Sequence, residues 1–151
     1  MTVRSLRRSI RALTLVTVCA AASGCTTRVI RPTGEMAGLL PVLSVERFLQ
    51  AANAGDWEAM RQLFGTVKGP IEGDRREIEL RMSAISEILK HDDYRIMGDT
   101  REPGREHPTT RVTVTITKGG RQFPDVPFLV VQTDRGGWLI EQVDLERITR
   151  G

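Results

Sequence analysis

The spacing of apolar residues changes once along the chain, and this change restricts the fold to one class. Between residues 44 and 89, apolar side chains recur every three or four positions, which is the period of an amphipathic helix. Between residues 109 and 117 they alternate with threonine and arginine, which is the period of a half-buried strand. Helices followed by strands predict an α+β domain, with N-terminal helices packed on an antiparallel sheet of about four strands.

Three helices are predicted before the change of period. Their expected N-caps are Ser44, Asp56 and Asp74, because short oxygen-bearing side chains accept hydrogen bonds from the first helical turn. Gly55 is expected to end the first helix, since glycine tolerates the left-handed conformation of a helix end. The residues expected on the apolar helix faces are Val45, Phe48, Leu49, Ala52, Trp57, Met60, Phe64, Ile78, Met82, Ile85 and Leu89.

Four strands are predicted after the helices. They cover residues 94–101, residues 109–117, a segment that ends in Phe128–Val131, and residues 138–145. Gly119 and Gly120 suit a hairpin turn between the second and third strands. Pro124 and Pro127 favour an edge position or a bulge in the third strand, because proline has no N–H to donate to a neighbouring strand.

Two stretches carry a resemblance to a known family. FLQAANAGDWEAMRQLF (residues 48–64) and GGWLIEQVDL (residues 136–145) resemble the nuclear transport factor two-like family, also called SnoaL-like, which has the cystatin-like fold. The resemblance covers residues 44–148 and implies a curved sheet that the helices cover to form an open-mouthed cone. Because the family includes isomerases, dehydratases, polyketide cyclases, noncatalytic binding proteins and envelope assembly modules, the resemblance predicts a fold rather than an activity.

The N-terminus predicts export. Arg4, Arg7, Arg8 and Arg11 precede eleven apolar residues, 12–22, whereas a membrane-spanning helix needs about 20. The following Ala22-Ser23-Gly24-Cys25 resembles the bacterial lipobox, which implies that Cys25 becomes the first mature residue and carries lipid. The alternative is an ordinary signal peptide that leaves Cys25 as a free thiol or an intermolecular disulfide partner.

These signals divide the chain into three parts. Residues 1–24 are the predicted lipoprotein signal peptide, residues 25–43 the acylated cysteine with a flexible tether, and residues 44–151 the domain. The expected partner of Cys25 is membrane lipid, and the expected location is the periplasmic face of the cell envelope. Thr26 stands where inner-membrane lipoproteins often have aspartate, which favours the outer membrane in a cell with two membranes.

Charge argues against a nucleic-acid partner. Four of the 22 basic residues and none of the 19 acidic residues precede Cys25, so the mature chain has 18 basic and 19 acidic side chains. Such a balance lacks the excess of positive charge that phosphate binding requires. Cys19 leaves with the signal peptide, so no disulfide within the mature chain is expected.

Few residues are candidates for catalysis. Glu141 alternates with Leu139 and Val143 and could share an apolar face with them, and Asp56 is a second carboxylate candidate, although helix capping accounts for it. No position matches the family's catalytic residues. His91 and His107 are too few for a zinc site, so neither a metal nor a cofactor is predicted.

Four strand residues are expected to need a cover. The segments around Phe128, Val130, Trp138 and Ile140 are apolar on both faces, so a sheet with one bare face would expose them. Three alternatives remain open: a homodimer or envelope protein partner covers that face, it lines an apolar cavity, or loops and the tether fold over it.

The sequence therefore favours a membrane-anchored, noncatalytic module that binds a protein partner or a small apolar ligand. One alternative is a SnoaL-like isomerase or hydrolyase that uses a pocket carboxylate. The other is an accessory subunit of an envelope secretion or assembly complex, which predicts an exposed apolar sheet face.

Overall fold

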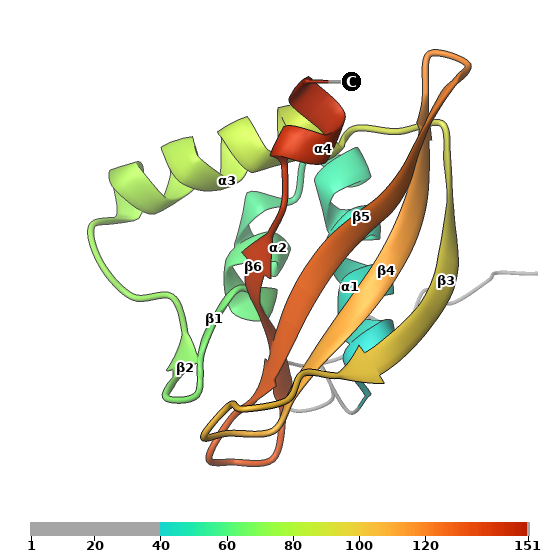
Figure 1. Ribbon diagram of the computed structural model, residues 1–151. Coiled ribbons are helices and arrows are strands. Elements are labelled where there is room, and N and C mark those ends of the chain that lie inside the picture. Colours follow the sequence, from blue (N-terminus) through green and yellow to red (C-terminus); the bar gives the residue numbers. More distant parts are fainter. Residues whose placement is uncertain (1–39, 151) are drawn as a thin grey trace, which may run out of the picture. The chain divides into compact units, whose positions relative to one another are not determined.

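The computed structural model describes residues 40–150 and confirms the α+β class, with helices first and a curved antiparallel sheet after them (Figure 1). The helices are α1 (Pro41–Ala54), α2 (Trp57–Leu63), α3 (Arg75–Leu89) and α4 (Glu146–Thr149). The main sheet has the order β3 (Asp93–Arg101), β4 (Thr109–Lys118), β5 (Arg121–Gln132) and β6 (Trp138–Val143). The predicted signal peptide, Cys25 and the tether up to residue 39 lie outside the described residues.

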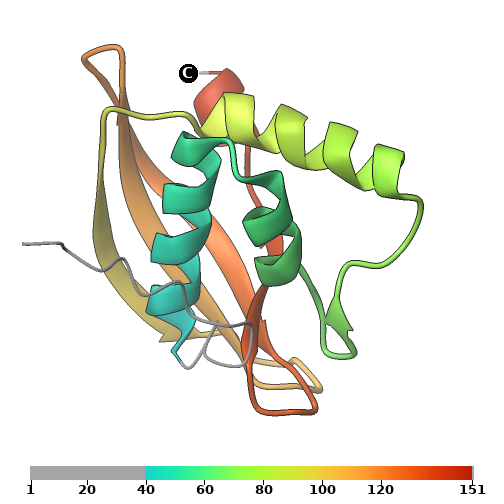
Figure 2. The same cartoon turned by 180° about the vertical axis from the view of Figure 1, so that it is seen from behind.

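Helices α1 and α2 lie on one face of the sheet, as the views from front and back show (Figures 1 and 2). Helix α1 contacts all four strands, whereas α2 contacts β6, and α3 packs on α1, α2 and α4. A short hairpin of β1 (Gly65–Thr66) and β2 (Gly69–Pro70) joins α2 to α3. This hairpin and α4 were not predicted from the sequence.

The first helix begins at Pro41, so the prediction of Ser44 as its N-cap was wrong. Proline suits the first turn because its fixed φ is helical and the N–H that it lacks has no partner there. Ser44 instead lies one turn inside the helix, where it is fully buried. Its hydroxyl donates a hydrogen bond of 2.9 Å to the carbonyl oxygen of Trp138, which ties α1 to the start of β6.

Replacing Ser44 by alanine is expected to lower the free energy of unfolding by about 1–2 kcal/mol, because a buried carbonyl oxygen loses its donor. Urea unfolding followed by circular dichroism measures this. Ser83→Ala, at a half-buried serine of α3, is the matched control and is expected to stay within about 0.5 kcal/mol. Equal effects of the two substitutions would contradict the role given to the Ser44 hydroxyl.

The other predicted helix ends are confirmed. Gly55 ends α1 in the left-handed conformation, with φ of 65°. The Asp56 carboxylate accepts a 3.0 Å hydrogen bond from the Ala59 N–H, and the Asp74 carboxylate accepts one of 3.1 Å from the Glu77 N–H. Each side chain satisfies a backbone donor that has no partner within its helix.

The hairpin and proline predictions for the sheet are also confirmed. Gly119 and Gly120 have φ of 59° and 75°, as the turn between β4 and β5 requires. Strand β6 pairs only with residues 128–132 of β5, so Pro124 and Pro127 lie in the part of β5 that β6 does not reach. The register also shifts near Pro124, between the pairs that Val114 and Ile116 make with β5.

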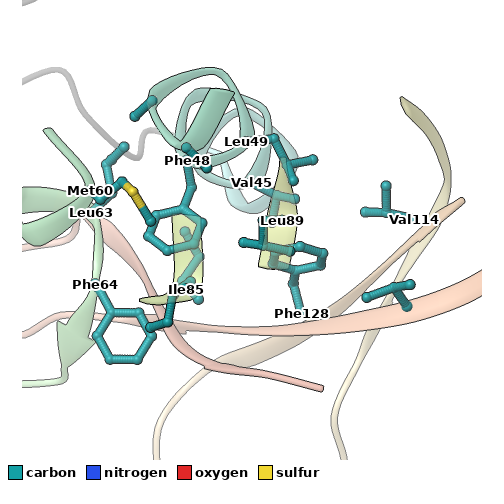
Figure 3. Close-up of a cluster of buried hydrophobic side chains, with 14 of the residues drawn as sticks. Val45, Phe48, Leu49, Met60, Leu63, Phe64, Ile85, Leu89, Val114 and Phe128 are labelled. Carbon is teal, nitrogen blue, oxygen red and sulfur yellow. The ribbon is translucent and has the colours of Figure 1, made fainter. Parts of the chain in front are cut away.

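A single hydrophobic core lies between the helices and the sheet (Figure 3). Alternate residues of β4 point into it, as the period of two predicted. Side chains with no exposed surface come from α1, α2, α3 and three strands: Val45, Phe48, Leu49, Met60, Met82, Leu89, Val112, Val114, Ile116, Val126, Phe128, Val130 and Ile140.

The four strand residues expected to need a cover are part of this core. Phe128, Val130 and Ile140 are fully buried under the helices, and the half-buried Trp138 packs against the same cluster. Phe128, Val130 and Ile140 therefore present no exposed apolar surface, because the domain's own helices cover them. On the other face of the sheet, Val131 lines a depression together with Arg105 and His107 of the β3–β4 loop.

Candidate functional site

Side chains fill the space between helices and sheet where the family resemblance implied an open cone. Phe48 of α1 stacks on Phe64 with ring centroids 6.1 Å apart, and Met60 lies beside them (Figure 3). The Arg81 guanidinium lies 5.0 Å from the centre of the Phe64 ring. A ligand that entered here would have to displace packed core residues, which is costly.

Two depressions lie at the margin of the core, one around α2 and the start of α3 and the other between the β1–β2 hairpin, α3 and β6. The larger, the α2–α3 groove, has a volume of about 700 Å³ and is lined by Gly55, Asp56, Trp57, Glu58, Arg61, Glu72, Gly73, Arg75, Ile78 and Glu79. The smaller, the hairpin pocket, has a volume of about 420 Å³ and is lined by Phe64, Gly65, Thr66, Lys68, Gly69, Pro70, Ile71, Glu72, Arg81 and Glu141. Glu72 borders both.

Trp57 is the exposed aromatic residue of the α2–α3 groove. It is the first residue of α2, directly after the Asp56 cap, and 41% of its surface is accessible. The sequence placed it on the buried face with Met60 and Phe64, and that prediction was wrong. The turn at Gly55 and Asp56 sets where α2 begins, and the first helical position lies at the margin of the core.

Two ion pairs neutralise both arginines of the groove. Arg61 donates to the Glu58 carboxylate at 2.5 and 3.0 Å, and Arg75 donates to the Glu79 carboxylate at 2.8 Å. The hydrogen bonds from Arg61 and then Gln62 lower the pKa of Glu58 to about 2. No ion pair among the described residues involves Asp56 or Glu72, so these two carboxylates leave the groove with a net negative charge.

The Glu58 carboxyl is expected to titrate below its ordinary pH range in the wild-type protein and at a clearly higher pH in an Arg61→Gln variant. Since the folded pKa lies below the ordinary value, the pair stabilises the fold above that value, and this contribution is lost as the pH falls towards 2. Both residues are at the surface, so the contribution at neutral pH is at most about 0.5 kcal/mol. NMR titration of the side-chain carboxyl carbons checks the prediction. An unchanged Glu58 midpoint in Arg61→Gln would contradict it.

Glu141 lies outside the apolar setting that the sequence allowed for it. A register shift in the β5–β6 pairing leaves Glu141 without a partner on β5, and Val143 pairs with the buried Phe128. Val143 packs against the core, whereas the Glu141 carboxylate accepts a hydrogen bond from Arg105 in the β3–β4 loop. A catalytic base of the isomerase type needs a desolvated pocket, and Glu141 is ion-paired and 30% exposed.

The remaining candidates are also accounted for by structural roles. Asp56 is exposed and caps α2, and His91 follows α3, with its ring edge-on to Tyr94 at 5.3 Å between ring centres. Within residues 40–150, no group of three or more metal-ligating side chains is placed to hold an ion. None of the helices in this range is long and apolar enough to cross a bilayer.

Helices followed by a curved, four-stranded antiparallel sheet define an α+β fold, which is the arrangement that the family resemblance implied. One solved structure of similar fold is named "Rd1NTF2_05 with long sheet". The two chains are 20% identical, the match covers 66% of this chain and 89% of the other, and the TM-score is 0.43. No protein-family model and no curated protein sequence matches the chain.

Sequence reasoning missed the α2–α3 groove. Its walls come from α2 and α3, and residues between the β1–β2 hairpin and α3, including Glu72, complete it. The sequence contained one signal for this groove, the GDW motif. Its Gly-Asp turn begins a short helix, and the first residue of that helix, Trp57, then lies at the surface. The other wall of the groove is formed by α3, and its position depends on the packing of α3 on α2, which the sequence did not predict.

Proposed function

We propose that this protein is an exported lipoprotein whose one domain is a noncatalytic module that binds a protein partner in the cell envelope. The observation that carries the noncatalytic part is the filled interior, in which Phe48, Phe64 and Met60 occupy the space that an enzyme of this fold needs for substrate. A small apolar ligand is disfavoured for the same reason.

The anchor is proposed from the sequence alone. Cys25 follows Ala22-Ser23-Gly24 and is taken to carry a diacylglycerol on sulfur, with a further acyl chain on its amino group. More than one acyl chain is needed for stable attachment to a bilayer. An anchored domain meets other proteins at the same membrane at a raised effective concentration, so a weak contact is sufficient for binding. The proposed location is the periplasmic face, at the outer membrane where two membranes exist.

An open groove supports a protein partner. The α2–α3 groove is rimmed by charged side chains and holds one exposed tryptophan, and tryptophan and arginine are enriched in protein interfaces. The exposed large hydrophobic residues of the described chain are Leu40, Trp57, Leu80 and Met97, which come from four separate elements or loops. They do not form the apolar sheet face that the accessory-subunit alternative predicts.

Mass spectrometry of the acylated protein, purified in detergent from its own cells, tests the proposal. The expected result is a protein partner that survives mild crosslinking and no stoichiometric metabolite released on denaturation. A metabolite bound one to one would contradict a filled, noncatalytic interior.

A further inference from the structure

We propose that the α2–α3 groove binds a protein segment that carries a cationic side chain next to an apolar one. This inference rests on the proposed function, because it gives the chemistry of the partner that the module would bind. The segment places its apolar side chain against Trp57 and its lysine or arginine between Trp57 and Glu72.

The shape of the groove favours an extended segment. A volume of about 700 Å³ is enough for a few residues of a partner chain. Gly55, before α2, and Gly73, before α3, both line it, and since neither has a side chain, a partner backbone can approach closely there. Ile78 is almost fully buried, so the accessible apolar surface of the groove comes from the Trp57 ring, which is 41% exposed.

The charges select the sign of the partner. Arg61 and Arg75 are each occupied by a carboxylate of the groove itself, at 2.5 and 2.8 Å. Asp56 uses one oxygen to cap α2, and Glu72 has no ion pair among the described residues. With four carboxylates and two guanidinium groups, the lining of the groove has a net negative charge that attracts a cation, and the face of the Trp57 indole adds a cation–π contact. Glu72 also borders the hairpin pocket, which Lys68 and Arg81 line, and its charge acts on Arg61, which Glu58 already holds.

Tryptophan fluorescence tests this with two matched peptides, acetyl-Lys-Leu-Lys-Leu-Lys-amide and its glutamate counterpart. The chain has two tryptophans, so the full chain with Trp138→Phe, in nonionic detergent, reports on Trp57 alone. The lysine peptide is expected to give a saturable change of Trp57 emission that weakens with salt, and the glutamate peptide none. Calorimetry on the wild-type protein replaces the fluorescence assay if the Trp138→Phe variant does not fold.

Two variants and one control make the result specific to the groove. Trp57→Ala, followed by calorimetry, is expected to weaken binding of the lysine peptide about thirtyfold, and Glu72→Lys about fivefold. Glu106→Lys makes the same charge change on the exposed β3–β4 loop and is expected to leave binding unchanged. Asp56 is left in place because it caps α2.

The inference is overturned by no saturable response to the lysine peptide, by equal binding of both peptides, or by equal effects of Glu72→Lys and Glu106→Lys. A change of Trp57 emission that depends on protein concentration alone would assign the groove to a second copy of this chain and would also overturn it. Peptide binding in detergent does not require the anchor, so its failure leaves the proposed lipoprotein module intact. A stoichiometric metabolite would contradict the module without any effect on the peptide result.

Discussion

Replacing Leu89 by alanine is expected to lower the free energy of unfolding by about 2–5 kcal/mol. Leu89 is the last residue of α3 and has no exposed surface, so its removal leaves a cavity where α3 meets α1 and the sheet (Figure 3). A domain of this size is stable by only about 5–15 kcal/mol, so the variant loses a large share of its stability.

Leu80 on the same helix is the matched control. It is 65% exposed, and Leu80→Ala is expected to stay within about 0.5 kcal/mol of the wild-type protein. Urea unfolding followed by circular dichroism at one protein concentration compares the two variants directly. If Leu80→Ala destabilised the protein as much as Leu89→Ala, the helix face assigned to the core would be incorrect.

Replacing Cys25 by serine is expected to move the protein from the membrane fraction to the soluble fraction. Serine has no thiol to form the thioether, so neither acyl chain can be attached through the lipoprotein route. The wild-type protein is expected to remain in the pellet after a high-salt wash and to incorporate labelled palmitate, since multiple acyl chains hold it stably. Fractionation and intact mass of the mature chain measure both effects.

Cys19→Ser is the control for the loss of a thiol. The chain has two cysteines, and Cys19 lies within the predicted signal peptide, so its replacement is expected to leave attachment unchanged. Release of both variants to the same extent would contradict anchoring through Cys25. A soluble wild-type protein without bound lipid would favour the ordinary signal peptide instead.

Local signals in the sequence predicted the helices and strands well. Asp56, Asp74 and Gly55 act within one helical turn, and Gly119-Gly120 acts within one hairpin, so each effect depends on residues close in sequence. Ser44 shows the limit of this reasoning. It is a residue type that caps helices, but the helix begins three positions earlier, at Pro41, and the Ser44 hydroxyl bonds to a carbonyl oxygen 94 residues away.

The candidate site could be predicted only in part. The GDW motif marked the turn before α2, but its tryptophan was assigned to the wrong face, and nothing in the sequence joined Glu72 to it. Glu141 was named from its alternation with apolar neighbours, and the irregular register between β5 and β6 interrupted that alternation between Glu141 and Val143. The Arg105 that pairs with it lies 36 residues earlier, in a loop whose position depends on the whole sheet.

The sequence by itself determined the class of fold, the order of helices and strands and most of their ends. It also predicts a lipid anchor at Cys25. All of these depend on the period of apolar residues or on short motifs, which act over a few residues. The tertiary structure alone decided that Phe128, Val130 and Ile140 are covered by the chain's own helices, that the interior is filled, and that a charged groove lies between α2 and α3. The physical reason is that burial and surface shape depend on how distant segments pack, and a repeat of apolar residues indicates which face is buried but not what covers it.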